Sequence, residues 1–200
     1  MLESLELDVP PFQILSYPSS DIELRSYLND KIDPNFFPNI IGDRIGVTIR
    51  VSLPGIKDRI RLGRHGGLHI TKKEQAIESI IERFDKYGNE AKIILQHTVD
   101  AMCSGTMIKD SKSVVEAVPG DAVPLLEGKT QHSEVWGLNV FGRWVKEKSI
   151  DSEREDSQLI PSNIFSVFTD IINQIKGNAY FEWSISKKRK IFFYDFIELN

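Results

Sequence analysis

Two acidic side chains near the end of the chain have the spacing of a metal-binding pair. Glu182 lies in an expected strand, 179–185, and Asp195 lies in the next expected strand, 190–197. A short basic turn joins the two strands into an antiparallel hairpin, so we expect the carboxylates to face each other. Such a pair repels unless a cation lies between the two charges, as Mg²⁺ does when it bridges ATP phosphates. The alternative is a pair of surface residues with nearby lysines as partners.

A second group of residues has the chemistry of a phosphate-binding site. Arg50 ends an expected strand, and a glycine loop follows it at residues 63–67, with the sequence Gly63-Arg64-His65-Gly66-Gly67. Glycines let backbone N–H groups approach an anion, and arginine can hold phosphate oxygens through two hydrogen bonds. The P-loop motif G-x-x-x-x-G-K-[ST] is absent from the sequence. The alternatives are ordinary turn chemistry and an arginine that pairs with Asp43 or Asp58.

The remaining candidate residues are expected to be structural. The four histidines lack the spacing of zinc ligands, and Cys103 has no base near it in sequence, so we expect a small buried residue rather than a nucleophile. Glu116 is either adjacent to the metal or a charge at the end of a strand, and we favour the second interpretation. Trp136 and Trp144 are expected in the core or in the wall of a cleft.

The elements that position these residues predict an α+β fold. Helices are expected at about 22–31, at 71–88 with a capping box from Thr71 to Glu74, and at 162–176 with Gly177 as its C-terminal cap. The other expected strands are 45–51, a short one near 68–70, 92–97, 105–108, 113–117 and 138–145. An extended piece at 9–15, a loop at 32–44 and an exposed segment at 146–157 complete the chain. Runs of antiparallel strands between helices indicate α+β rather than alternating α/β architecture.

Composition narrows the class of protein. The chain has 200 residues, enough for one domain or two small lobes, and its formal net charge is −4. General nucleic-acid binding needs a basic surface, so we do not expect it. One cysteine suits a reducing compartment, and no apolar run approaches the ~20 residues of a membrane span. The acidic N-terminus lacks the basic region of a signal peptide, so we expect a cytoplasmic protein without a membrane partner.

The order of several short motifs resembles one family. The nucleotide-binding domain of phosphoenolpyruvate synthase and pyruvate phosphate dikinase carries approximately V-A-V-R-S-S, A-G-Q-H-E-T, V-Q-x-M-V, S-G-V, E-A-x-x-G-L-G-E and D-I-E-W in that order. Similar segments stand here at 46–52, 63–67, 94–99, 104–106, 115–120 and 179–183, over about three quarters of the chain. The resemblance implies an ATP-grasp-like fold of two lobes, 1–90 and 91–200, with antiparallel sheets and packed helices around a nucleotide cleft.

The resemblance also implies roles for individual residues. Arg50 matches the family's arginine on the ATP phosphates and would be the catalytic group. The cofactor-binding residues would be Arg50, Gly63, Arg64, Gly67 and Gln96, where Gln96 matches the adenine-side glutamine and Gly67 replaces a threonine. Glu182 matches the metal-binding glutamate of D-I-E-W, and Asp195 takes the place of a glutamine near the metal.

These matches favour binding of Mg²⁺ and ATP, with phosphoryl transfer as the implied reaction and a separate protein carrying a phosphohistidine domain as the implied partner. The sequence also departs from the family. The early V-G-G-K segment is missing, and Ile197 replaces the last arginine of the family pattern. The alternative is a degenerate, non-catalytic module that acts in protein interaction or ligand binding.

Overall fold

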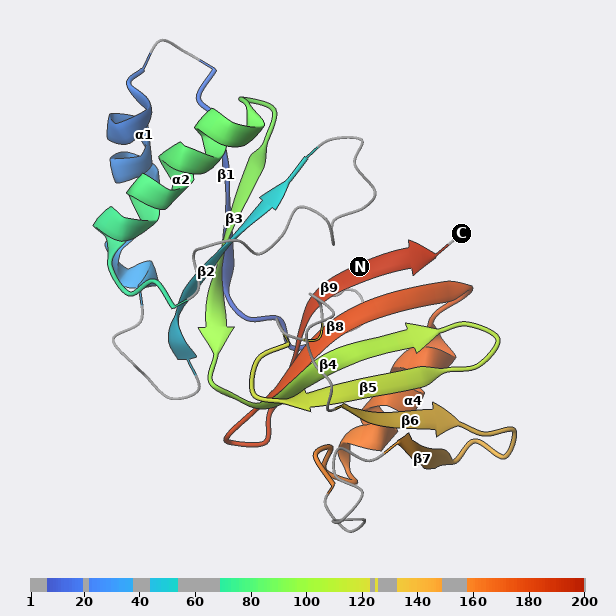
Figure 1. Ribbon diagram of the computed structural model, residues 1–200. Helices are drawn as coiled ribbons and strands as arrows, with labels where there is room; N and C mark the ends of the chain where they lie inside the picture. The colour runs from blue at the N-terminus through green and yellow to red at the C-terminus, as the bar shows by residue number, and fades with distance from the viewer. Residues whose placement is uncertain are drawn as a thin grey trace. The chain divides into compact units, whose positions relative to one another are not determined.

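The computed structural model describes residues 7–19, 22–37, 44–53, 69–122, 125, 133–148 and 158–199. The chain forms two compact units (Figure 1). The N-terminal unit is Pro10–Val99, and the C-terminal unit is Asp100–Asn200 together with Met1–Val9. Each unit combines an antiparallel sheet with packed helices, so the predicted α+β fold class is confirmed.

The N-terminal unit is a three-stranded sheet covered by helices on one face. The strand order is β1 (Phe12–Ser16), β3 (Lys92–Val99) and β2 (Arg44–Ser52), and all neighbours are antiparallel. The helices are α1 (Leu24–Lys31) and α2 (Lys73–Tyr87), and a short 3-10 helix, η2, spans Pro34–Phe36. Alternate apolar residues of the strands meet the apolar side of the helices, so the core includes Leu28, Val47, Ile49, Ile77, Ile80, Phe84, Ile93 and Leu95.

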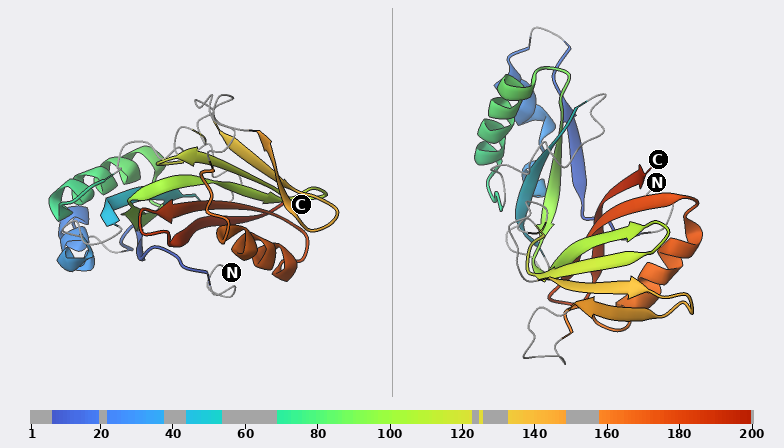
Figure 2. Two further views of the ribbon diagram at one scale, coloured as in Figure 1. Left: turned by 90° about the horizontal axis from the view of Figure 1, so that it is seen from below. Right: turned by 45° about the vertical axis from the view of Figure 1, so that its right-hand side comes forward.

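The C-terminal unit is a six-stranded antiparallel sheet. Its order is β7 (Trp144–Lys148), β6 (Glu134–Leu138), β5 (Val114–Pro119), β4 (Ala101–Lys109), β8 (Asn178–Ser186) and β9 (Ile191–Leu199). Helix α4 (Ile164–Gln174) lies on one face of this sheet (Figure 2). The core between them holds Phe168 of α4 against Trp183 of β8, with ring centroids 5.2 Å apart.

The structure corrects several sequence-based boundaries. The segment 138–145, predicted as one strand, contains the end of β6 and the start of β7, and residues 139–143 form a hairpin turn between them. The side-chain oxygen Oδ1 of Asn139 accepts the N–H groups of Phe141 and Arg143 at 3.0 Å each, and Gly142 has a φ of +71°. These bonds turn the chain where the apolar run suggested a continuous strand. The predicted exposed segment starts too early, because residues 146–148 belong to β7.

Two helix ends also differ from the prediction. Helix α2 begins after Lys72, and no side chain caps it, so the predicted capping box from Thr71 does not form. Its end at Gly88, with a φ of +84°, is confirmed. Helix α4 ends at Gln174, before the predicted cap Gly177. The ammonium group of Lys109 donates to the carbonyls of Ile172 and Ile175 instead, a favourable place for a cation at a helix C-terminus.

Within the described residues, no helix is long and apolar enough to cross a membrane.

Candidate functional site

The hairpin of β8 and β9 brings the predicted acidic pair together. In β8, Phe181 and Trp183 are buried against α4, so Glu182 between them belongs to the opposite face of the sheet. The register places Glu182 directly opposite Asp195 of β9, which confirms that the two residues face each other across the hairpin. The exposed fractions are 5% for Glu182 and 8% for Asp195, so the pair is shielded from bulk water.

A β-bulge makes this arrangement possible. Glu182 pairs with Asp195, but Trp183 pairs with Phe193, so Tyr194 is the extra residue on β9. In a regular strand, residues 193 and 195 would lie on the same face. The bulge separates them, so Phe193 joins the core while Asp195 shares the face of Glu182. The sequence carries no obvious signal for this bulge.

Local hydrogen bonds orient both carboxylates. The hydroxyl of Tyr180, two residues along the same face, lies 3.4 Å from Oε1 of Glu182 as a donor. The backbone N–H of Phe196 donates to Oδ1 of Asp195 at 3.0 Å. Both acidic side chains make further polar interactions in the structure, so a ligand would join or replace existing partners.

The same face of the sheet is polar across four strands. The register aligns Glu116 of β5, Thr106 of β4, Glu182 and Asp195 in one row. Neighbouring strands are about 4.8 Å apart, so the backbone at Glu116, two strands away, lies about 10 Å from that at Glu182. Two residues along each strand, on the same face, the hydroxyls of Ser104 and Ser184 form a buried hydrogen bond of 2.6 Å. Among the described residues, no three His, Cys, Asp or Glu side chains are grouped so that they could hold a metal ion.

The donor set nevertheless fits Mg²⁺ delivered with phosphate. Magnesium prefers oxygen ligands, keeps several waters, and is usually bound by one or two carboxylates together with substrate phosphates rather than by an all-protein cage. Glu182 and Asp195 supply two such carboxylates at one place. The pair can therefore provide the protein side of a shared coordination shell.

The predicted phosphate-side residues lie in the N-terminal unit. Nη1 of Arg50 donates to Oε1 of Gln96 at 3.4 Å, on the face of the sheet opposite the helices. Thr48 and Thr98 on the same face share a hydroxyl hydrogen bond of 2.7 Å. The structure thus brings Arg50 and Gln96 together. The other predicted residues of this group, Gly63, Arg64 and Gly67, lie outside the described residues.

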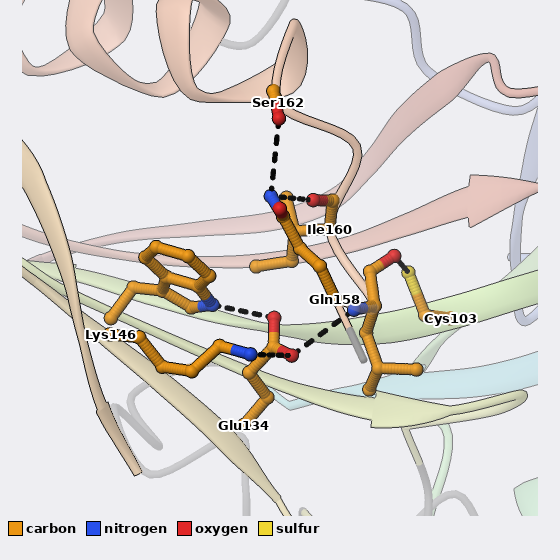
Figure 3. A network of polar contacts seen from close by, with 8 residues as sticks. Cys103, Glu134, Lys146, Gln158, Ile160 and Ser162 are labelled. Carbon is orange, nitrogen blue, oxygen red and sulfur yellow. Dashed lines mark hydrogen bonds and ion pairs between the residues drawn. The ribbon is translucent and has the colours of Figure 1, made fainter. Parts of the chain in front are cut away.

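Sequence reasoning missed Glu134, whose polar contacts are drawn in Figure 3. It is 1% exposed, the most buried carboxylate among the described residues of the C-terminal unit. Its Oε1 accepts the indole N–H of Trp136 at 2.5 Å, and its Oε2 accepts the backbone N–H of Leu159 at 3.1 Å. The ammonium of Lys146 lies 3.4 Å from Oε2. Because protein donors satisfy both oxygens, Glu134 holds the segment before α4 against β6, the strand next to the edge strand β7. The alternation of Glu134 and Trp136 was the only local signal.

Cys103 lies beside this network and is fully buried, which confirms the predicted structural role. Its Sγ donates to the carbonyl of Leu159 at 3.5 Å. Burial, and to a lesser degree the charge of Glu134, raises the pKa of the Cys103 thiol to about 12. The thiol therefore stays protonated near neutral pH and cannot act as a nucleophile.

Comparisons with known proteins give distant structural likenesses only. No protein-family model and no curated protein matches the sequence. Among solved structures, the D-alanine-D-alanine ligase from Helicobacter pylori is similar with a TM-score of 0.47 and 8% identity, over 100% of this chain and 51% of that one. The ligase from Coxiella burnetii gives 0.43 and 9%, over 98% and 44%. D-alanyl-alanine synthetase A from Vibrio cholerae gives 0.42 and 12%, over 98% and 52%.

The chain spans about half the length of these structures. Likeness at this level assigns neither a family nor an activity. The functional argument therefore depends on the residues of this chain.

Proposed function

We propose that this chain binds Mg²⁺ and ATP through an ATP-grasp-like fold. The observation that carries the proposal is the buried pair of Glu182 and Asp195, set opposite each other on a polar sheet face by the bulge at Tyr194. The bulge supports a functional interpretation, because bulges often re-aim a side chain next to a binding site. The motif order that resembles the phosphoenolpyruvate synthase domain supports the same ligand.

In this proposal, Glu182 and Asp195 hold the metal ion. When bound, Mg²⁺ neutralises negative charge on the phosphate oxygens that it contacts. The two side chains belong to adjacent strands of one sheet, so their backbones need little rearrangement on binding. The hydroxyl of Tyr180 donates to Oε1 of Glu182 at 3.4 Å and would help to fix the position of that carboxylate.

Arg50 is the proposed phosphate-binding residue and, if transfer occurs, the catalytic one. A guanidinium group has several N–H donors in one plane, and its bond to Gln96 uses one of them. Gln96 would hold Arg50 in place and contact the adenine side of the nucleotide. Gly63, Arg64 and Gly67 complete the proposed phosphate-binding group on the strength of the sequence resemblance alone.

The proposal extends to phosphoryl transfer from ATP to an acceptor on a separate protein, such as a phosphohistidine domain. Stabilisation of the transferred group would come from positioning and charge neutralisation by Arg50 and the metal. An ATP-binding module without transfer activity is the alternative, and the loss of the family's lysine and terminal arginine favours it.

Calorimetric titration with ATP in Mg²⁺ and then in EDTA tests the proposal. We expect saturable binding that needs Mg²⁺, and a loss of about tenfold or more in affinity for Glu182→Gln, because the amide removes a charged oxygen ligand. The matched control is Glu116→Gln, which neutralises a carboxylate on the same sheet face two strands away. Its affinity should remain close to that of the wild type.

Two results would contradict the proposal. The first is equal Mg²⁺-dependent affinity in the wild type and in Glu182→Gln. The second is no heat and no thermal stabilisation at millimolar ATP, which would favour the interaction module.

A further inference from the structure

The turn between β8 and β9 contacts the chain at both places where it passes between the two units. These crossings are Val9–Pro10 and Val99–Asp100. The ammonium of Lys190 lies 2.9 Å from Oδ1 of Asp8, next to the first crossing. The ammonium of Lys187 lies 2.9 Å from Oδ1 of Asp100, at the second. One basic turn of the C-terminal unit thus binds an aspartate at each crossing.

Backbone hydrogen bonds reinforce both contacts. The N–H of Phe193 donates to the carbonyl of Asp8 at 2.9 Å, and the N–H of Lys187 donates to the carbonyl of Asp100 at 3.1 Å. The turn itself is closed by bonds from Ser186 to Lys190 and from Arg189 to Ser186, each 2.8 Å long. These bonds fix the backbone of the turn and hold the backbones of Asp8 and Asp100 next to it.

The crossings themselves are short. Asp100 is the only residue between β3 and β4, which belong to different sheets. The other crossing runs into Pro10 and Pro11, whose rings restrict backbone rotation. Figure 1 shows the β8–β9 turn near the start of β4, at the end of the sheet where the chain enters the C-terminal unit.

We propose that the turn Ser186–Lys190, with Asp8 and Asp100, is a hinge clamp. It holds the C-terminal-unit ends of both connections and confines movement between the units to Val9–Pro10 and Val99–Asp100. Hinges are a few residues at element ends that absorb the change in backbone angles, so fixing their neighbours limits the range of motion. The clamp belongs to the hairpin that carries Glu182 and Asp195, but the inference does not depend on nucleotide binding.

The clamp should act on motion rather than on folding. The paired side chains are 30% to 67% exposed, and exposed ion pairs stabilise a fold only weakly. Salt screens such pairs, so the range of motion should respond to ionic strength. The two backbone bonds would persist when the charges are removed, which should keep the sheet intact.

Time-resolved fluorescence energy transfer tests the clamp in the full chain. Dyes are attached at Glu90→Cys in the N-terminal unit and Phe141→Cys in the C-terminal unit, both exposed positions. The natural Cys103 is buried and will not react. The variant Lys187→Met with Lys190→Met should widen the distance distribution by about half or more. Lys112→Met is the matched control, because it breaks an exposed ion pair with Glu147 away from the crossings.

Two further measurements make the test decisive. Raising NaCl from about 0.05 M to about 1 M should widen the distribution of the wild type but not that of the double variant. A second variant exchanges the charges of one ion pair, with Lys187→Asp and Asp100→Lys in the same chain. Because an ion pair can still form at this place, its distance distribution in low salt should be as narrow as that of the wild type. Equal widths in the wild type and the double variant, or equal widening by Lys112→Met, would overturn the clamp.

Discussion

Cys103 illustrates, at the scale of a single residue, how burial sets the chemistry of a side chain. The thiol is enclosed between β4 and the segment before α4, where it donates to the carbonyl of Leu159. In the unfolded chain the same group would ionise near its ordinary pKa of 9.0, whereas in the fold its pKa is about 12. The folded state therefore holds this proton more tightly than the unfolded state does.

That difference predicts a pH dependence of stability. The contribution of Cys103 is fully present below about pH 9 and is lost as the pH rises toward 12, because the unfolded state then gains a thiolate that the folded state resists. Between those limits we expect the free energy of unfolding to fall by up to about 1.4 kcal/mol per pH unit more in the wild type than in Cys103→Ala. Urea unfolding of both proteins at alkaline pH measures this difference. Parallel pH profiles would show that the thiol is not protected.

At the scale of elements, Gly105 allows β4 to lie between its neighbours. A Cβ at this position would lie 1.9 Å from the carbonyl oxygen of Glu116 and 2.7 Å from the ring of Trp183. The ring of Trp183 is fully buried, and the carbonyl oxygen of Glu116 belongs to the backbone of β5. Displacement of either group would therefore cost folding free energy. We expect Gly105→Ala to lower the free energy of unfolding by about 1–3 kcal/mol in denaturant titrations. Gly137→Ala is the control, since the atoms nearest to its Cβ would be the flexible ends of the Glu147 and Lys112 side chains. Equal effects would contradict the close packing.

Local sequence patterns predicted the presence of helices and strands more accurately than the residues at which they begin and end. β-branched and aromatic runs located β2, β3, β8 and β9, and the expected hairpin brought Glu182 and Asp195 to facing strands, although the bulge that sets their register had no signal in the sequence. The turn at Asn139 was missed because Leu138, Val140 and Phe141 make the segment apolar, although the Asn and Gly pair was a usable signal. The partners of Glu134 could not be predicted, because Leu159 lies 25 residues away and meets it only through the packing of α4. The metal and phosphate roles stay predictions.

At the scale of the whole molecule, the described residues form two hydrophobic cores that share no residue. One core joins α1 and α2 to the three-stranded sheet, and the other joins α4 to the six-stranded sheet. Chain connections between the units are limited to Val9–Pro10 and Val99–Asp100. Cooperativity within a unit depends on its packed core, so each unit has its own source of stability.

A cavity-forming substitution in one core should lower the stability of that unit and leave the stability of the other unit nearly unchanged. Ile80 of α2 and Phe168 of α4 are both fully buried, each in a different core. We expect Ile80→Ala to lower the opening free energy of amides in the N-terminal unit by about 2–5 kcal/mol and to leave those of the C-terminal unit nearly unchanged. Phe168→Ala should show the reverse pattern. Hydrogen exchange followed by mass spectrometry resolves both units in one experiment. If either substitution lowered protection equally in both units, the chain would unfold as one cooperative body, and the two cores would be coupled through the short connections.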